Sequence, residues 1–339
     1  MKILVTGGLG YIGSHTAVEL SKNYNTVIVD NLINSDISII DKINKISFSK
    51  VSFEKGDLTD LTIVKKLFEK HPDIKGVIHF AALKSVKDSV IDPTSYYHNN
   101  IVSLFNLLSE IKSNKMVVNF IFSSSATVYG EPENLPISEE EKIKIALSPY
   151  GNTKQICEEI LTDFCKSNNY FNCISLRYFN PVGAHKSSEI GELPNGVPQN
   201  LVPYISQSAA GIRKELTIFG GDYKTKDGTC IRDYIHVVDL ANAHICALNY
   251  LEKNKGVEND VFNIGTGIGT SVFEIIESFE KVTSLKVNYK IGARRDGDVA
   301  SAYTDNRKAK EVLGWKSKFT LEDALLSAWN WEKKLRGLK

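Results

Sequence analysis

The stretch Lys2–Gly13, KILVTGGLGYIG, decides the fold of this chain. A short apolar run is followed by glycines at positions 7, 10 and 13, and an amphipathic segment begins at Ser14. Glycines in this order permit a tight turn, a close approach of the backbone to a pyrophosphate, and close packing of helix on strand. The N-terminus of the helix offers unpaired N–H groups and a partial positive charge to phosphates. The stretch therefore predicts a dinucleotide-binding turn, and the alternative is a turn that needs glycine for packing only.

The segments that follow alternate between short apolar runs and amphipathic stretches. Continuous apolar strands that alternate with helices are typical of a parallel sheet covered on both faces. The predicted fold is α/β: a Rossmann-type doubly wound parallel sheet with a smaller C-terminal α/β substrate-binding region. The expected strands are Ile3–Thr6, Val27–Asp30, Val51–Lys55, Gly76–Phe80, Phe120–Ser123 and Cys173–Arg177, and the expected helices are Ser14–Lys22, Leu61–Lys70, Tyr96–Ile111 and Tyr150–Asn168.

Glycine and proline become frequent after about Asn180, which indicates loops and short helices grafted on the sheet. A later strand–helix pair, Ile231–Val237 and Val238–Tyr250, is expected to return to the sheet, and the chain from Lys310 onward to form a surface helix region. We therefore assign residues 1–176 and about 231–262 to a cofactor-binding domain. Residues 177–230 and 263–339 form the expected substrate-binding region.

Bulk composition excludes several classes of protein. The net charge of +1 over 339 residues argues against an electrostatic nucleic-acid binder. No apolar run approaches the length of a membrane span, and the chain reads straight into a strand with no signal peptide. The five cysteines show neither a Cys-x-x-Cys pair nor zinc spacing, so we expect reduced thiols, a cytoplasmic protein and no metal site.

Acidic residues end the second and third expected strands. Asp30, followed by Asn31, lies where a carboxylate accepts the ribose hydroxyls of a dinucleotide and repels a 2′-phosphate, so NAD is favoured over NADP. Asp57, followed by Leu58, lies at the height of an adenine edge. Asp57 is equally well placed to be the N-cap of the helix expected over Leu61–Lys70, and both interpretations remain open.

Tyr150 and Lys154 lie four residues apart on an expected helix, so their side chains share one face. A free tyrosine has a pKa near ~10 and is a poor base at neutral pH. A nearby ammonium favours the phenolate and lowers that pKa. The pair can then take a proton from an alcohol while another group takes the hydride. The alternative is a chance pair on a helix face.

Ser125 follows a β-run, at the carboxyl end of a strand where α/β sheets bind ligands. Its hydroxyl donates and accepts hydrogen bonds, which suits an oxygen that cycles between alcohol and ketone. Arg232 and Arg295 carry planar forks suited to a diphosphate, although either alone is more simply a surface ion pair. His79 fits a core histidine, and Asp233 fits a partner for a neighbouring cation.

Taken together, these motifs resemble the extended short-chain dehydrogenase/reductase superfamily over the whole chain. Within it, the sequence is most similar to the UDP-galactose 4-epimerases. The segments that carry the resemblance are Gly7–His15, His79–Val86, Ser123–Gly130, the Tyr150–Lys154 pair, Arg177–His185, Arg232–Val237 and Arg295–Asp298.

The resemblance implies a role for each matching residue. Tyr150 is the acid/base, Lys154 holds the nicotinamide ribose, and Ser125 bonds the sugar 4-hydroxyl. The cofactor contacts that it implies are Gly7, Gly10, Tyr11, Ile12, Gly13, Asp30, Asn31, Asp57, Leu58, Phe80, Ala81, Ala82, Lys84, Asn99, Tyr150, Lys154 and Phe179. The substrate contacts that it implies are Lys84, Ser125, Tyr150, Asn180, Asn200, Leu201, Phe219, Arg232, Arg295, Asp298 and Ala302.

The activity that the resemblance implies is NAD-dependent inversion of C4 in UDP-hexoses through a transient 4-keto sugar. The first domain is then the NAD-binding Rossmann domain, and the second region binds the UDP-sugar. The helices expected over Tyr96–Ile111 and Tyr150–Asn168 resemble dimer-forming helices of the family, so a homodimer is expected. Both could instead be covered within one chain.

Substrate breadth rests on one position. Some relatives carry a bulky tyrosine seven residues after the arginine that corresponds to Arg295, beside C2 of the sugar. Here that residue is Ala302, which leaves room for an N-acetyl group and predicts activity on UDP-N-acetylhexosamines. Tyr303 follows directly, so a shift of one residue in the alignment reverses this expectation.

Two other functions fit the fold. One is a different nucleotide-sugar enzyme, such as a dehydratase or a decarboxylase. Dehydratases of this type carry an Asp-Glu pair after the threonine of the catalytic strand, whereas Thr127 lies between Ala126 and Val128. The other is an inert NAD-sensing protein, in which Tyr150, Lys154 or Ser125 should have been lost. Fold alone does not decide between these functions.

Overall fold

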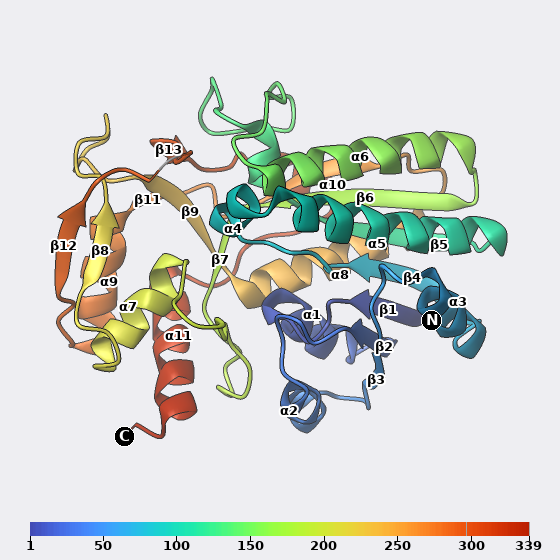
Figure 1. Ribbon diagram of the computed structural model, residues 1–339, viewed down its shortest axis with the longest axis horizontal. Coiled ribbons are helices and arrows are strands. Elements are labelled where there is room, and N and C mark those ends of the chain that lie inside the picture. Colours follow the sequence, from blue (N-terminus) through green and yellow to red (C-terminus); the bar gives the residue numbers. More distant parts are fainter. Residues whose placement is uncertain (296, 339) are drawn as a thin grey trace.

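The computed structural model of the protein describes residues 1–295 and 297–338. Within these residues, seven parallel strands form the main sheet in the order β10-β6-β5-β4-β1-β2-β3 (Figure 1). The strand order reverses between β1 and β4, which opens a crevice at the carboxyl ends of the strands. The strands are β1 (Lys2–Thr6), β2 (Asn25–Asp30), β3 (Ser52–Lys55), β4 (Ile74–His79), β5 (Val118–Ser125), β6 (Phe171–Tyr178) and β10 (Asp260–Ile264). The six strands expected from the sequence are confirmed.

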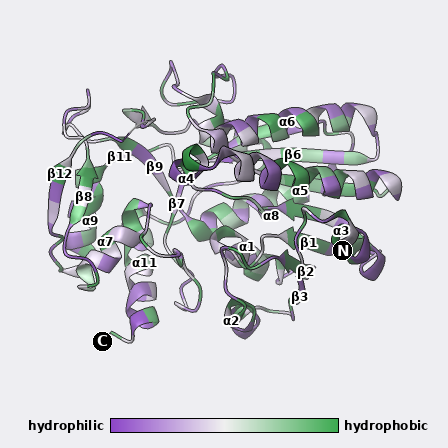
Figure 2. Ribbon diagram, in the orientation of Figure 1, coloured by the Kyte–Doolittle hydropathy of each residue, from purple (hydrophilic) through white to green (hydrophobic). Residues whose placement is uncertain are grey.

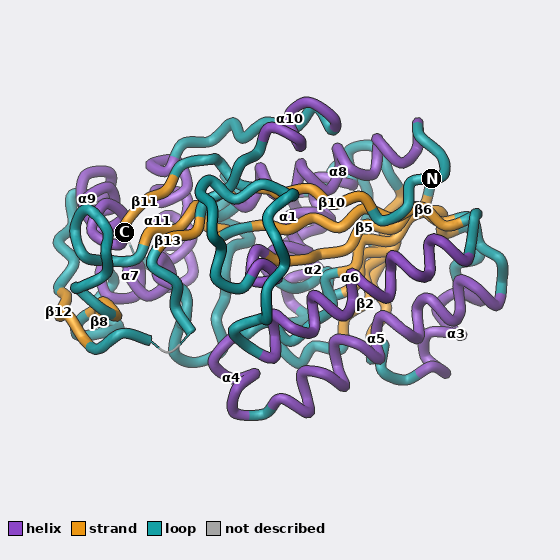
Figure 3. Tube along the Cα trace, turned by 90° about the horizontal axis from the view of Figure 1, so that it is seen from above, coloured by secondary structure: helices purple, strands orange, loops and turns teal. Residues whose placement is uncertain are grey.

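Helices cover both faces of this sheet (Figures 1 and 3). Successive side chains of a strand point to opposite faces. Ile3 and Val5 therefore pack in one apolar cluster with α1 and α8, whereas Leu4 packs in a second cluster with α3, α5 and α6. The covering helices are α1 (Tyr11–Leu20), α2 (Ser38–Ile46), α3 (Leu61–Lys70), α4 (Val86–Ile91), α5 (Pro93–Ser113), α6 (Pro149–Ser167) and α8 (Val237–Lys253).

A smaller unit continues the chain beyond β6 (Figure 1). Its helices α7, α9 and α11 bury a third apolar cluster that includes Ile205, Phe279 and Trp329. The region expected as a surface helix thus contributes to a core, because α11 buries Leu325 and Trp329. The elements of this unit are β7 (Asn180–Val182), α7 (Leu201–Ala209), β8 (Leu216–Phe219), β9 (Ile231–His236), β11 (Gly269–Ser271), α9 (Val272–Thr283), β12 (Tyr289–Gly292), β13 (Ser301–Ala302) and α11 (Leu321–Arg336). Two further elements adjoin the main sheet: η1 (Ala126–Tyr129) follows β5, and α10 (Arg307–Val312) packs on β10.

Strand β9 does not return to the main sheet, so that expectation is wrong. It pairs with β7 and β13 in parallel and with β11 antiparallel, while α8 returns to the main sheet and β10 forms its seventh strand. The Asp233 carboxylate of β9 accepts hydrogen bonds from the backbone N–H groups of Thr266, Gly267 and Thr304. These bonds join Asp233 to the loops of the smaller unit instead of to the expected cation. The division of the chain into domain ranges stays a prediction.

Hydropathy follows this layering. Green, apolar ribbon concentrates on the strands of the main sheet and on the helix faces turned toward them (Figure 2). Within the described ranges, no helix combines the length and the apolar character needed to cross a bilayer. In those same ranges, no group of three His, Cys, Asp or Glu side chains is placed to hold a metal ion.

Candidate active site

The residues predicted to contact a cofactor gather at one edge of the main sheet. Because β1 to β6 are parallel, the loops that follow them meet at their carboxyl ends. Asn99 joins them from α5. In chain order the loop residues are Gly7, Gly10, Tyr11, Ile12 and Gly13 after β1, Asp30 and Asn31 around the end of β2, Asp57 and Leu58 after β3, Phe80, Ala81, Ala82 and Lys84 after β4, and Phe179 after β6.

The glycine turn forms a cradle that side chains would fill. Gly7 has φ +64, and a Cβ added there would lie 2.8 Å from the backbone nitrogen of Ala81. A Cβ at Gly13 would lie 2.5 Å from the carbonyl oxygen of Gly7. Gly10 caps α1 without any side-chain hydrogen bond, so the first N–H groups of the helix point outward uncapped. This cradle fits the pyrophosphate of a dinucleotide.

The Asp30 carboxylate links the end of β2 to the glycine turn. It accepts hydrogen bonds from the backbone N–H groups of Leu9 at 3.1 Å and Leu32 at 2.9 Å. Asn31 donates to Asp57 at 3.1 Å, which brings the ends of β2 and β3 together. These contacts place the three polar residues side by side along the crevice.

Asp57 is not the N-cap of α3. Its carboxylate accepts from the backbone N–H and the hydroxyl of Thr59, at 2.8 and 2.7 Å. The cap is Asp60, which accepts from the N–H of Thr62 at 2.8 Å. The capping interpretation of Asp57 is therefore wrong, and its cofactor role stays a prediction.

Tyr150 and Lys154 lie in the first turns of α6, which begins after the N-cap Ser148. The Lys154 ammonium donates to the backbone carbonyl of Ser123 at 2.7 Å. It lies 5.9 Å from the centre of the Tyr150 ring, so both side chains face the end of β5. Ser125 ends that strand, and its hydroxyl oxygen accepts from the N–H of Thr127 at 3.2 Å. The three predicted catalytic residues therefore share one space.

Burial opposes the charged forms of both side chains. It raises the pKa of Tyr150 to about 12, although a hydrogen bond with Ser125 acts in the opposite direction. Burial lowers the pKa of Lys154 to about 8. In the protein alone, the shift of the Tyr150 pKa is thus opposite to the one expected from the sequence, because burial dominates it and the ammonium is turned toward the Ser123 carbonyl. A phenolate at Tyr150 needs further positive charge in the site.

The predicted substrate contacts form two pairs on the smaller unit. The Arg232 guanidinium on β9 donates to the Asp298 carboxylate at 3.1 Å. The Arg295 guanidinium lies 4.3 Å from the centre of the Phe219 ring, at the end of β8. The Arg295–Asp298 motif includes residue 296, which lies outside the described residues. Both arginines thus come from segments far apart in sequence but adjacent in the smaller unit.

Glu192 is a polar residue of the site that sequence reasoning missed. Its carboxylate accepts from the Asn200 amide at 2.6 Å and lies 3.7 Å from the Lys84 ammonium. Burial raises the pKa of Glu192, and its charge adds to the burial that raises the pKa of Tyr11. Glu192 could not be predicted from residue spacing, because it is a single glutamate in a loop rich in glycine and proline.

The remaining predicted contacts lie around these groups. Asn180 is exposed on β7, Asn200 caps α7, and Leu201 is the first residue of that helix. Lys84 is largely exposed, as its loop position suggests. His79 is buried in β4 beside Thr6, as expected of a core histidine.

Ala302 lies on β13 opposite Arg232 of β9. It packs against a small cluster that contains Tyr129 and Phe179. Tyr303 faces the other way, because a Cβ on Gly269 would meet its ring at 2.9 Å. Ala302, not Tyr303, therefore faces the side of the strand that leads to Ser125 and η1.

A doubly wound sheet with a glycine cradle, and a serine and a Tyr-x-x-x-Lys pair at its carboxyl edge, defines an extended short-chain dehydrogenase/reductase. A family model described as GDP-mannose 4,6 dehydratase matches residues 4–327. The UDP-glucose 4-epimerase of Pasteurella multocida is 48% identical over 335 residues, with 98% of each chain covered. The chain belongs to this dehydratase-like family, and within it to the UDP-glucose 4-epimerases.

Two solved structures share the whole architecture. The UDP-glucose 4-epimerase of Bifidobacterium longum, in complex with NAD+ and UDP, has a TM-score of 0.94 at 43% identity and covers 98% of each chain. The UDP-Glc/GlcNAc 4-epimerase of Campylobacter jejuni has a TM-score of 0.84 at 38% identity, with 98% of this chain and 99% of that chain covered. The predicted fold class is confirmed.

Proposed function

We propose that this protein interconverts UDP-galactose and UDP-glucose by inverting C4 of the hexose, with NAD as its resident cofactor. The observation that carries the proposal is the convergence of Ser125, Tyr150 and Lys154 beside the glycine cradle. Two findings support the proposal. Relatives of similar length and sequence are named UDP-glucose 4-epimerases, and one of their structures is a complex with NAD+ and UDP. NAD is expected in preference to NADP, because Asp30 ends β2, where a carboxylate would accept the ribose hydroxyls and repel a 2′-phosphate.

Each of these residues has a separate role in the proposed reaction. The glycine cradle would hold NAD, which would supply a reversible hydride acceptor for C4 of the sugar, so that no net oxidation occurs. Tyr150 takes the proton of the 4-hydroxyl and later returns it, and Ser125 bonds the same oxygen. In the loaded site, the positive charge of the nicotinamide would favour the phenolate of Tyr150 against the burial that raises its pKa.

The smaller unit anchors the part of the substrate that does not react. The Arg232 and Arg295 guanidinium groups suit the two phosphates, and the Phe219 ring beside Arg295 offers an apolar face. Binding energy on the nucleotide leaves the hexose free to turn and present its other face to the cofactor. The 4-keto sugar is thereby held in the site while it turns.

A dehydratase, which the description of the family model names, is not favoured. The Ser125–Thr127 turn leads into η1 with Ala126 and Val128, and no acidic side chain follows Thr127 within that turn. An inert protein is not favoured either, because the catalytic serine, tyrosine and lysine are all present. The identity with epimerases over nearly the full chain points the same way.

The direct test is turnover without added cofactor. Purified protein incubated with UDP-galactose alone should produce UDP-glucose, because the cofactor is regenerated in every cycle. The product is measured by coupling to an NAD-dependent UDP-glucose dehydrogenase after the protein has been removed. Release of a dehydrated 4-keto sugar instead of UDP-glucose would assign the protein to the dehydratases.

We also propose that the enzyme accepts N-acetylated UDP-hexosamines. Ala302 is small, lies beside Arg232, and packs near Phe179 at the cofactor edge. A small side chain there leaves volume for the acetamido group. The likeness to an enzyme described as acting on UDP-Glc and UDP-GlcNAc agrees with this.

Finally, we propose a homodimer formed through α5 and α6, which pack side by side (Figures 1 and 3). Phe105 of α5 is 60% exposed, an uncommon position for a large aromatic ring unless a partner covers it. Light scattering at micromolar concentration should give about twice the chain mass of 37.7 kDa, and Phe105→Asp should give that of the single chain. A wild-type mass of one chain would contradict the proposal.

A further inference from the structure

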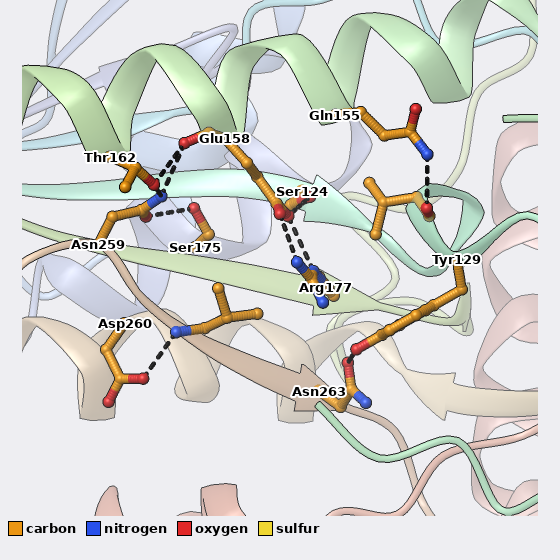
Figure 4. Close-up of polar contacts among 12 residues, drawn as sticks. Ser124, Tyr129, Gln155, Glu158, Thr162, Ser175, Arg177, Asn259, Asp260 and Asn263 are labelled. Carbon is orange, nitrogen blue, oxygen red and sulfur yellow. Dashed lines mark hydrogen bonds and ion pairs between the residues drawn. The ribbon is translucent and has the colours of Figure 1, made fainter. Parts of the chain in front are cut away.

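A buried ion pair joins helix α6 to strand β6 (Figure 4). Glu158 of α6 accepts two hydrogen bonds from the Arg177 guanidinium of β6, at 2.9 and 2.5 Å. The two side chains are only 7% and 5% exposed. Ser124 of β5 donates to the same carboxylate. The pair therefore ties one helix to two neighbouring strands of the main sheet.

Each member of this group adjoins a residue of the site in sequence. Glu158 follows Lys154 by one helical turn, Ser124 precedes Ser125, and Arg177 lies two residues before Phe179. A displacement of α6 along β5 would consequently move Lys154 relative to Ser125. The ion pair resists such a displacement because its two hydrogen bonds can both form in only one register of α6 against β6.

The group continues to the substrate side of the site (Figure 4). The Arg177 guanidinium lies 4.8 Å from the centre of the Tyr129 ring, and the Tyr129 hydroxyl donates to Asn263 at 2.7 Å. The Asn263 amide donates to the carbonyl of Ile137 at 3.0 Å. The N–H of Ile137 in turn donates to the carbonyl of Tyr303 at 2.9 Å. One chain of contacts thus joins the catalytic helix to the segment that carries Ala302.

Asn259 holds the opposite end of the group. Its φ of +37 lies in the left-handed region, which asparagine adopts more readily than most residues other than glycine. Its amide donates to the backbone carbonyl of Glu158 and to the hydroxyl of Thr162, both at 3.0 Å, and its oxygen accepts from Ser175 at 2.7 Å. The Asn259 side chain thus fixes α6 to β6 (Figure 4).

Stability alone does not account for this arrangement. Burying two charges costs desolvation energy, and their attraction offsets this cost only when the geometry is good and additional hydrogen bonds form. Proteins in which such a pair is replaced by apolar side chains are often as stable as the original. The pair instead fixes how α6 lies against β6, since a guanidinium and a carboxylate form two parallel hydrogen bonds in one orientation only. Contacts between apolar side chains are not directional in this way.

We propose that the Glu158–Arg177 pair is a positioning element for catalysis, which holds helix α6 in the one register against β5 that aligns Tyr150 and Lys154 with Ser125. The inference rests on the proposed epimerase function. Glu158 and Arg177 are positioning residues, because they act through their neighbours.

Glu158 has a second effect on the site through its charge. Around the Lys154 ammonium lie Tyr150, Cys157 and Glu158 of α6, His79 of β4, and the Ser123 carbonyl of β5. Burial lowers the pKa of His79 to about 3 and raises the pKa of Cys157 to about 12, so both are neutral near pH 7. The Glu158 carboxylate therefore favours the protonated form of Lys154 against burial. Without it, the Lys154 cation is lost at lower pH.

The test compares Glu158→Gln with the double variant Glu158→Gln/Arg177→Met, beside Glu159→Gln, which changes an exposed glutamate on the same helix. In both variants at Glu158, kcat for UDP-galactose should fall about 10- to 100-fold, with KM within about 3-fold of wild type, as for misplaced catalytic groups. The alkaline limb of the pH dependence of kcat should move to lower pH in Glu158→Gln. Glu159→Gln should match wild type throughout.

Thermal unfolding separates positioning from stability. The double variant carries no unpaired buried charge, so it should unfold near the wild-type temperature while its kcat stays low. A stable double variant with wild-type kcat overturns the inference, as does Glu158→Gln with wild-type kcat and an unmoved alkaline limb. An inactive wild-type protein would instead refute the proposed function, so the two failures are distinguishable.

Discussion

Replacing Tyr150 with phenylalanine should lower kcat for UDP-galactose by about 10²- to 10⁴-fold, the range expected when a general acid–base group is removed. The change keeps the ring and removes only the hydroxyl, which is the group that we propose exchanges a proton with O4 of the sugar. The nucleotide contacts proposed for Arg232 and Arg295 lie on another unit and should be unaffected. Steady-state kinetics and binding of UDP by calorimetry measure the two effects separately.

The matched control is Tyr97→Phe, which removes a hydroxyl that accepts from Asn152 of α6 at 2.6 Å but stands outside the catalytic group. We expect this control to retain kcat within a few-fold of wild type, because an ordinary hydrogen bond contributes about 1 kcal/mol. Near-normal turnover of Tyr150→Phe, with UDP binding intact, would exclude Tyr150 as the acid/base.

The second large effect is expected at Ala302. Ala302→Tyr should reduce activity on UDP-N-acetylgalactosamine by at least about 100-fold and leave activity on UDP-galactose within a few-fold, since a bulky ring rejects the acetamido group but tolerates a hydroxyl. Both substrates are assayed with the same preparations of wild type and variant. The ratio of the two kcat/KM values is the quantity that should change.

Tyr303→Phe serves as the control, because the Tyr303 ring packs toward Gly269 on the other side of the strand. It should leave both activities unchanged. A wild-type protein that is inert on the acetylated substrate would show that other loops close the pocket and that Ala302 is only a small packing residue.

The main sheet could be predicted from the sequence because its strands are continuous apolar runs between turn residues, a local signal. The position of β9 could not. Its sequence, IRDYIH, is similar to that of any strand that precedes a helix. The sheet to which β9 belongs depends on its pairing with β7, β11 and β13. Pairing is a contact between distant segments, which periodicity does not encode.

That Ser125, Tyr150 and Lys154 share one space could be predicted from the sequence, because their spacing and types carry chemical information. Glu192 and the Glu158–Arg177 pair were not found, since each acts through partners that only folding brings together. The pKa of Tyr150 was predicted in the wrong direction for the protein alone for a related reason. The spacing shows that an ammonium shares the helix face, but not that it points to the Ser123 carbonyl or that burial outweighs it.

The route of the chain has a consequence for synthesis on the ribosome. The polypeptide leaves the main sheet after β6, builds β7 to β9, and returns only with α8 and β10. Between residues 178 and 260, the nascent chain exposes the open edge of β6 and the apolar side of the sheet that α8 later covers. At the elongation rates of cells, that interval lasts roughly 4 to 16 seconds. The main sheet is therefore completed only after β7, α7, β8 and β9 of the smaller unit have been made.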